Sequence, residues 1–150
     1  MRSRGGVVHG GPRARGPRGR LMAFARSWAA GAVVLALTAY TQATVVHRYL
    51  VGPGGVGSFG AALALVHLPN LLSVTLATWA AARVHPEPWR HDPVRHPVAA
   101  CAVPVAALLL ASALRPEFLA PAHGSLWMST AVLLAGCAAG LLLDKLVWTS

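Results

Sequence analysis

Charged residues are scarce in this chain of 150 residues. Asp, Glu, Lys and Arg make up only 11% of it, against roughly a quarter of a soluble domain, while hydrophobic residues make up 55%. Only 4 residues are acidic, and we expect each of them in a loop or at the end of an apolar segment: Glu87, Asp92, Glu117 and Asp144. These shortages exclude an ordinary soluble domain and leave no buried acid for catalysis or ion coupling.

Cysteine is almost as rare, since Cys101 and Cys137 are the only two. They lie 36 positions apart in separate apolar segments, so the sequence contains no C-x-x-C motif for dithiol chemistry and no framework of disulfides. We expect both side chains to be small buried hydrophobic groups. Isoleucine is missing altogether, and lysine and asparagine occur once each, as Lys145 and Asn70. This bias is typical of GC-rich coding and indicates a bacterial source.

The glycine-rich segment 52–57, GPGGVG, matches the dinucleotide-binding pattern G-x-G-x-x-G. That pattern works where a strand precedes it and an acidic residue follows about 20 positions later. An apolar segment precedes it here, so we expect a glycine-rich hairpin between two spans instead. Neither a nucleophile with its base nor a pair of acids is recognisable, and we therefore predict that the protein is not an enzyme and has no resident cofactor.

Four long apolar segments account for most of the remaining chain: 27–46, 60–82, 98–114 and 125–143. About 20 helical residues, rising about 1.5 Å each, cover the roughly 30 Å of bilayer hydrocarbon. Because an unpaired backbone amide is costly in hydrocarbon, segments of this composition cross it as helices. The sequence therefore predicts an all-α integral membrane bundle of four transmembrane helices over 27–148, located in the cell membrane.

The first 26 residues form a basic leader, with six arginines among the glycines and prolines of residues 1–20. Too few apolar groups are present to offset the entropy of ordering, so we expect 1–26 to be a disordered tail. No aromatic residue among the first 20 is available to stack on bases, which argues against a nucleic-acid partner. Met22 is also a plausible start for a membrane protein, which leaves open whether 1–21 belong to the native chain.

Basic residues are distributed unequally between the two ends of the predicted bundle. If the tail, the loop 83–97 and Lys145 lie on one side, that side holds 11 of the 13 basic residues, and the other holds Arg48 and Arg115. Under the positive-inside rule both termini are cytoplasmic, and anionic lipid headgroups on that side are expected partners. Tryptophans mark the same boundary: Trp28, Trp79, Trp89 and Trp148.

Histidines are the main candidates for a cofactor or metal site. Three of them fall in the predicted outer half of the bundle: His47, His67 and His123. Imidazoles from different helices can hold haem or a transition metal, but only His67 lies well inside a span, so a neutral, hydrogen-bonded histidine is the simpler interpretation. A second set of competent zinc ligands lies in the loop 83–97, where prolines separate them and a solvated loop is expected: His85, His91 and His96.

Two further features concern contacts inside the membrane. His67 and Asn70 lie one turn apart in the second span, where such groups bind a substrate, relay protons or join helices. Gly136 and Gly140 form a G-x-x-x-G motif in the fourth span, which lets two helix backbones approach closely. We expect this motif to serve packing within the bundle more than homo-oligomerisation.

These observations favour a non-enzymatic interaction or scaffold component of the cytoplasmic membrane, associated with another membrane protein or with copies of itself. One alternative is a haem- or metal-binding redox subunit that uses His67 with His47 or His123. The other alternative is an oligomeric small transporter with a polar path near His67 and Asn70. The first span lacks the glutamate that the small four-helix multidrug exporters carry there, which argues against that family.

Overall fold

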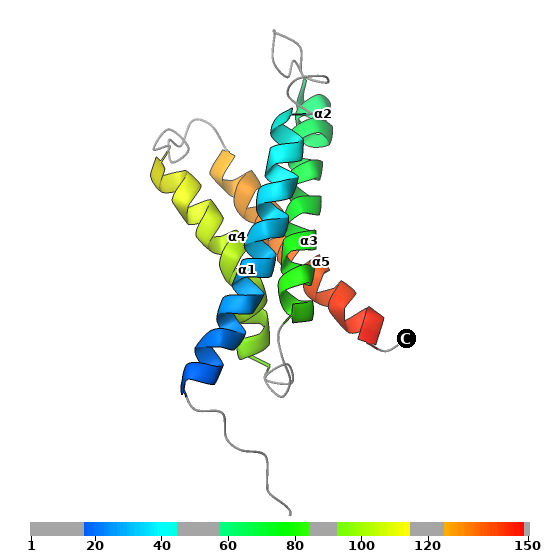
Figure 1. Ribbon diagram of the computed structural model, residues 1–150. Helices are drawn as coiled ribbons and strands as arrows, with labels where there is room; N and C mark the ends of the chain where they lie inside the picture. The colour runs from blue at the N-terminus through cyan, green and yellow to red at the C-terminus, as the bar shows by residue number, and fades with distance from the viewer. Residues whose placement is uncertain (1–16, 45–57, 85–92, 115–124, 149–150) are drawn as a thin grey trace, which may run out of the picture.

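The computed structural model describes residues 17–44, 58–84, 93–114 and 125–148. These residues are helical apart from short turns and contain no strand, which confirms the all-α prediction. Figure 1 shows α2, η2 and α3 as one continuous rod. The elements in chain order are α1 (Pro17–Thr41), α2 (Phe59–Ala62), the π-helical turn η2 (Leu63–His67), α3 (Leu68–Val84), α4 (Arg95–Leu114) and α5 (Ser125–Trp148).

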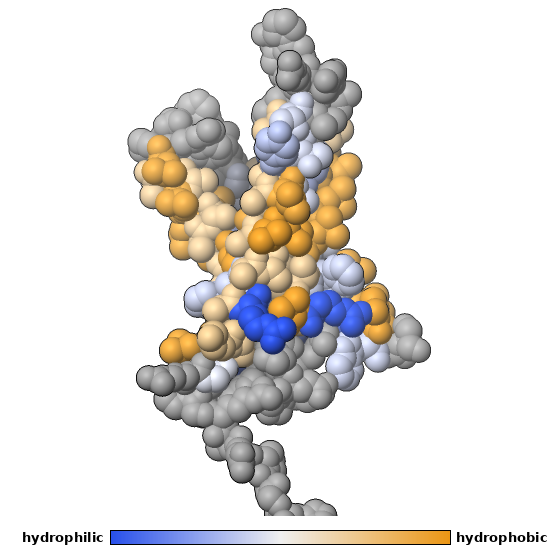
Figure 2. All heavy atoms as spheres, in the orientation of Figure 1, coloured by the Kyte–Doolittle hydropathy of each residue, from blue (hydrophilic) through white to orange (hydrophobic). Residues whose placement is uncertain are grey.

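Within the described residues, four helical segments are long and apolar enough to cross a membrane: Leu21–Thr44, Phe59–Val84, Arg95–Leu114 and Trp127–Trp148. Each overlaps one predicted span, so the prediction of four helices long and apolar enough to span a membrane is confirmed. The segments run alternately up and down, and α1 begins at the same end of the bundle at which α5 ends (Figure 1). Large apolar side chains cover much of the outside, shown in orange in Figure 2, which suits hydrocarbon better than water.

The first and third spanning helices begin earlier than the sequence indicates. α1 starts at Pro17, so the expectation of disorder is wrong for 17–26, while 1–16 lie outside the described residues. Proline suits the first helical position because its fixed φ is already helical and it has no N–H group to leave unpaired. α4 starts at Arg95 and accommodates Pro97 in its first turn for the same reason.

The interior of the bundle is built from alanine and small hydroxyl side chains. α3 contacts α1, α4 and α5. Ser27 of α1 is fully buried, and its hydroxyl donates a hydrogen bond to the carbonyl of Ala81 in α3 at 2.6 Å. Small side chains let helix backbones approach closely, and van der Waals contact then holds the helices together in lipid. The fully buried residues of α3 and α4 are all of this kind: Ala77, Thr78, Ala81, Ala82, Ala99 and Ala100.

Two glycines bring α5 against α3. A Cβ atom built on Gly136 would lie 2.6 Å from Cγ1 of Val74. A Cβ atom built on Gly140 would lie 2.7 Å from the carbonyl oxygen of Thr75 and 2.8 Å from Cβ of Thr78. These distances are shorter than van der Waals contact, so a larger residue at either position would force the two helices apart. The G-x-x-x-G motif therefore packs within the chain.

Replacing Gly140 by alanine tests this contact. Gly140→Ala should lower the free energy of unfolding in detergent by about 1–3 kcal/mol, because the added methyl group must displace the backbone of α3. Thermal unfolding followed by circular dichroism measures the change. The control is Ala138→Leu, on an exposed face of the same helix, which should alter stability by no more than about 0.5 kcal/mol. Equal stability of Gly140→Ala and the wild type would contradict the close approach of α3 and α5.

Candidate functional site

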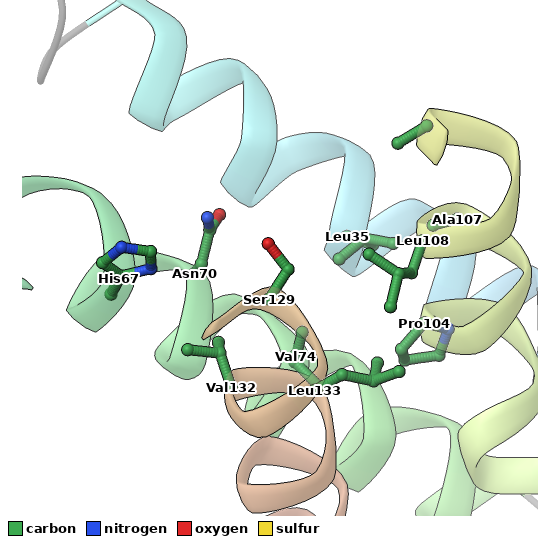
Figure 3. Close-up of a pocket in the computed structure, with 11 residues that line it drawn as sticks. Leu35, His67, Asn70, Val74, Pro104, Ala107, Leu108, Ser129, Val132 and Leu133 are labelled. Atoms are coloured by element: carbon green, nitrogen blue, oxygen red, sulfur yellow. The ribbon is translucent and has the colours of Figure 1, made fainter. Parts of the chain in front are cut away.

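A cavity of about 230 Å³ opens among all four spanning segments. It lies in the half of the bundle away from the start of α1, where Figure 1 shows α4 leaning away from α1 and α3. One side of the cavity is polar and carries His67, Asn70 and Ser129, as Figure 3 shows. The facing side is apolar and is formed mainly by Leu35, Pro104 and Leu108.

The polar side chains of this cavity have no hydrogen-bond partner among the described residues. Asn70 is exposed and His67 and Ser129 are half-buried, and none of the three side chains forms a hydrogen bond with a described residue. Transfer of an unpaired amide or hydroxyl from water to hydrocarbon costs about 4–8 kcal/mol. At the depth of a membrane span these groups therefore need water, a ligand or a protein partner in the cavity.

An irregular stretch of backbone positions His67 and Asn70. The π-helical turn Leu63–His67 ends two residues before Pro69, which has no N–H group to donate to the preceding turn. Gln42, just beyond the end of α1, donates a hydrogen bond from Nε2 to the carbonyl of Val66 at 3.3 Å. A neighbouring helix thus satisfies a carbonyl of the irregular turn, and His67 and Asn70 are not used for that purpose. Single π-helical turns within α-helices occur frequently at functional sites.

Thr38 and Gln42 do not share the cavity of His67. They line a separate depression of about 300 Å³ between α1 and α3, together with Ser73. The hydroxyls of Thr38 and Ser73 donate to carbonyls of their own helices at 2.9 and 2.8 Å. The polar residues of the first span are therefore largely satisfied within their own helix and do not extend the cavity.

The structure describes two of the histidines considered as ligands. His67 lines the cavity, whereas His96 lies in the first turn of α4 at the opposite end of the bundle. Within the described parts of the chain, no three side chains of His, Cys, Asp or Glu gather in a way that could hold a metal ion. The other candidates lie outside the described residues: His47, His85, His91 and His123.

A cluster of charged side chains joins three helices at the end of the bundle opposite the cavity. Asp144 of α5 is only 4% exposed. Its Oδ1 lies 3.6 Å from Nε of Arg83 in α3, and its Oδ2 lies 3.3 Å from Nε2 of His96 in α4. The guanidinium of Arg83 also lies over the ring of Trp79, with Cζ 5.8 Å from the ring centroid. The sequence placed Asp144 at the end of a span and the two bases in a loop. The expectation that no acidic residue is buried is therefore wrong for Asp144, which is buried beside Arg83 and His96.

The two cysteines meet between α4 and α5. The side chains of Cys101 and Cys137 lie near one another, and the hydroxyl of Thr78 in α3 donates a hydrogen bond to Sγ of Cys137 at 3.7 Å. Both are free thiols, with Cys137 buried and Cys101 half-buried. Their separation along the sequence excludes a local motif, but two antiparallel helices can still place them side by side. The absence of C-x-x-C therefore did not mean the absence of a thiol pair.

Three features thus distinguish this bundle from a purely apolar one: the cavity, the ion cluster and the thiol pair. Comparisons with protein-family models, with curated proteins and with solved structures found no match to this chain.

Removing the carboxylate of Asp144 tests the ion cluster. Asp144→Ala should lower the free energy of unfolding in detergent by about 1–3 kcal/mol, because it removes the acceptor that both Arg83 and His96 contact. Asp144→Asn keeps the volume and one acceptor oxygen and should cost less. Thermal unfolding measures both, with Leu142→Ala on the exposed face of α5 as the control. If Asp144→Ala unfolds at the temperature of the wild type, the cluster does not hold these helices together.

Proposed function

We propose that the protein is a multi-pass, non-enzymatic component of a bacterial cytoplasmic membrane and that it acts by association. In this proposal the cavity receives a polar group of a membrane partner, which is either another membrane protein or a second copy of the chain. Both termini lie in the cytoplasm, where anionic lipid headgroups surround the basic end of the bundle.

The distribution of charge supports this orientation. The described residues of the end that carries the cavity contain neither Lys nor Arg. Figure 2 shows the most hydrophilic residues gathered toward the opposite end. Cytoplasmic ends of membrane proteins carry an excess of Lys and Arg, so this basic end is assigned to the cytoplasm. Its described arginines and lysine are Arg18, Arg20, Arg26, Arg83, Arg95 and Lys145.

The unpaired polar side chains of the cavity are the observation on which the association depends. Asn70 lies near the middle of the 26-residue span Phe59–Val84, where hydrocarbon offers no hydrogen-bonding group. Asn70 and Ser129 both point into the cavity (Figure 3). A partner that presents a polar group at this depth satisfies side chains that form no hydrogen bond with the described residues. Polar contacts of this kind stabilise helix association in membranes by about 1–2 kcal/mol.

Fusion reporters test the orientation. A green fluorescent protein fused after Ser150 should fluoresce, because it folds in the cytoplasm, and alkaline phosphatase fused at the same place should be inactive. Alkaline phosphatase inserted between residues 115 and 124 should be active, because this segment is assigned to the outer side. The reverse pattern of fluorescence and phosphatase activity would overturn the assignment of both termini to the cytoplasm.

Photo-crosslinking in intact membranes tests the association. A photoreactive amino acid at Ala111, an exposed residue of the cavity lining, should give a discrete cross-linked product. The same amino acid at Leu110, exposed on the same helix but outside the cavity, should not. Asn70→Leu should reduce the Ala111 product about tenfold, because the partner loses a hydrogen bond in hydrocarbon. The control Leu68→Ala should leave it unchanged.

The mass of the cross-linked product identifies the partner. A product of twice the mass of the chain indicates a second copy, and any other discrete mass indicates a different membrane protein. Equal products at Ala111 and Leu110, or an Ala111 product that is unaffected by Asn70→Leu, would show that the cavity is not where the protein associates.

A further inference from the structure

The chemistry of the cavity wall restricts the kind of group that the cavity can receive. The described residues that line it include no Asp, Glu, Lys or Arg. A charged group at this depth would therefore meet no fixed opposite charge, and an uncompensated charge in hydrocarbon is strongly unfavourable. The polar side of the wall offers hydrogen-bond donors and acceptors instead, from His67, Asn70 and Ser129. The complement of this wall is a neutral group that has donors and acceptors of its own.

Asn70 narrows the choice to a second carboxamide. A carboxamide has two N–H donors and an oxygen with two lone pairs, so two of them pair in one plane, each donating to the oxygen of the other. A hydroxyl has a single donor and cannot form this pair, and the ester groups of lipids only accept hydrogen bonds. Because Asn70 and Ser129 point into the same space (Figure 3), the remaining N–H group of an incoming carboxamide is available to Ser129.

The position of the cavity indicates which kind of molecule carries this group. Asn70 and Ala111 both line the cavity and are exposed, so the cavity is open to the surroundings of the bundle. Asn70 lies near the middle of the span Phe59–Val84, where the surroundings are lipid chains and other transmembrane segments. Lipid chains offer no hydrogen bond, and a protein segment that crosses hydrocarbon is helical. The carboxamide therefore comes from a transmembrane helix, as an asparagine or glutamine near the middle of that helix.

A second copy of the chain is a poor source of this group. The sequence contains one asparagine and one glutamine, Asn70 and Gln42. Gln42 lies only two residues from the end of the span Leu21–Thr44, and its Nε2 already donates to the carbonyl of Val66 at 3.3 Å. Asn70 belongs to α3, which packs against α1, α4 and α5. These neighbours keep the α3 helices of two copies further apart than the roughly 8–10 Å that separates the axes of helices in contact.

We propose that the cavity receives the carboxamide of an asparagine or glutamine from a transmembrane helix of a different membrane protein. This inference rests on the proposed association and specifies the chemistry of the partner. Its basis is the combination of a wall without charged side chains, an amide that points into the cavity, and the lack of a second available carboxamide in the chain itself.

Host–guest peptides test this chemistry. The full-length protein, with a photoreactive amino acid at Ala111, is reconstituted in vesicles of phosphatidylethanolamine and phosphatidylglycerol. A biotinylated transmembrane peptide of about 20 leucines with one guest residue at its centre is added, and the cross-linked product is measured against the peptide-to-lipid ratio. Asparagine and glutamine guests should bind about tenfold more tightly than leucine or serine guests. Aspartate and lysine guests should bind no more tightly than leucine, because the wall offers no opposite charge.

A double-mutant cycle with Asn70→Leu assigns the preference to Asn70. This variant should remove the tenfold preference for an asparagine guest, because the guest loses the amide with which it pairs. The control is Thr41→Val, which removes an exposed hydroxyl outside the cavity and should keep the preference. If Asn70→Leu does not fold, the peptide series on the wild type decides by itself. The proposal is overturned by equal binding of asparagine and leucine guests, by tighter binding of a charged guest, or by a preference that persists in folded Asn70→Leu.

Failure of this proposal is distinguishable from failure of the association. A product at Ala111 in intact membranes that depends on Asn70 but has twice the mass of the chain keeps the association and overturns the different partner. The absence of any product that depends on Asn70 in intact membranes overturns the association itself. The peptide series needs no natural partner, so it reports separately which group the cavity accepts.

Discussion

The contact between α5 and α3 at Gly136 and Gly140 determines where the other features of the bundle lie. At Gly140 the backbone of α5 rests directly on the carbonyl of Thr75 and the side chain of Thr78. Because α5 crosses α3 at this point, Cys137 comes within hydrogen-bonding distance of Thr78, and Asp144, one turn beyond Gly140, reaches Arg83. Above the crossing the helices separate, and the cavity occupies the space between them. The close packing at the two glycines and the open cavity above them thus both result from the crossing of α5 and α3.

Polar side chains in the rest of the bundle show why the cavity is unusual. Most intramembrane hydroxyls are satisfied within their own helices: Thr75 donates to Leu71 and Ser112 donates to Leu108. Such local bonds need no neighbouring helix, so they neither specify packing nor attract a partner. His67 and Asn70 have side chains that could form several hydrogen bonds, and they form none with the described residues. His67 ends the irregular turn and Asn70 lies in the first turn of α3 after it, and both line the cavity, which distinguishes them from the satisfied hydroxyls.

The sequence predicted what depends on composition and missed what depends on helix crossing. Four spans follow directly from apolar segments, because hydrocarbon imposes helical structure on any chain that crosses it. The start of α1 at Pro17 was missed because a basic, proline-rich composition outweighed the preference of proline for a helix N-terminus. The pairing of Cys101 with Cys137, and of Asp144 with Arg83, depends on crossing points and rotations between helices. Hydropathy reports neither the crossing points nor the rotations. The G-x-x-x-G motif indicates that a helix packs closely against another helix, but it does not indicate which one.

The three residues of the ion cluster are synthesised in a fixed order, with the two bases before the acid. Arg83 and His96 leave the ribosome before Asp144 does. When the last helix emerges, Arg83 and His96 of the earlier helices have already been synthesised, and they can contact the carboxylate of Asp144. Long basic side chains are tolerated near the membrane surface, because their apolar stems let the charge reach the headgroups. The side chain of an aspartate in the same position is too short to place its charge among the headgroups. Both bases that contact Asp144 in the folded bundle are therefore already present when the last helix is synthesised.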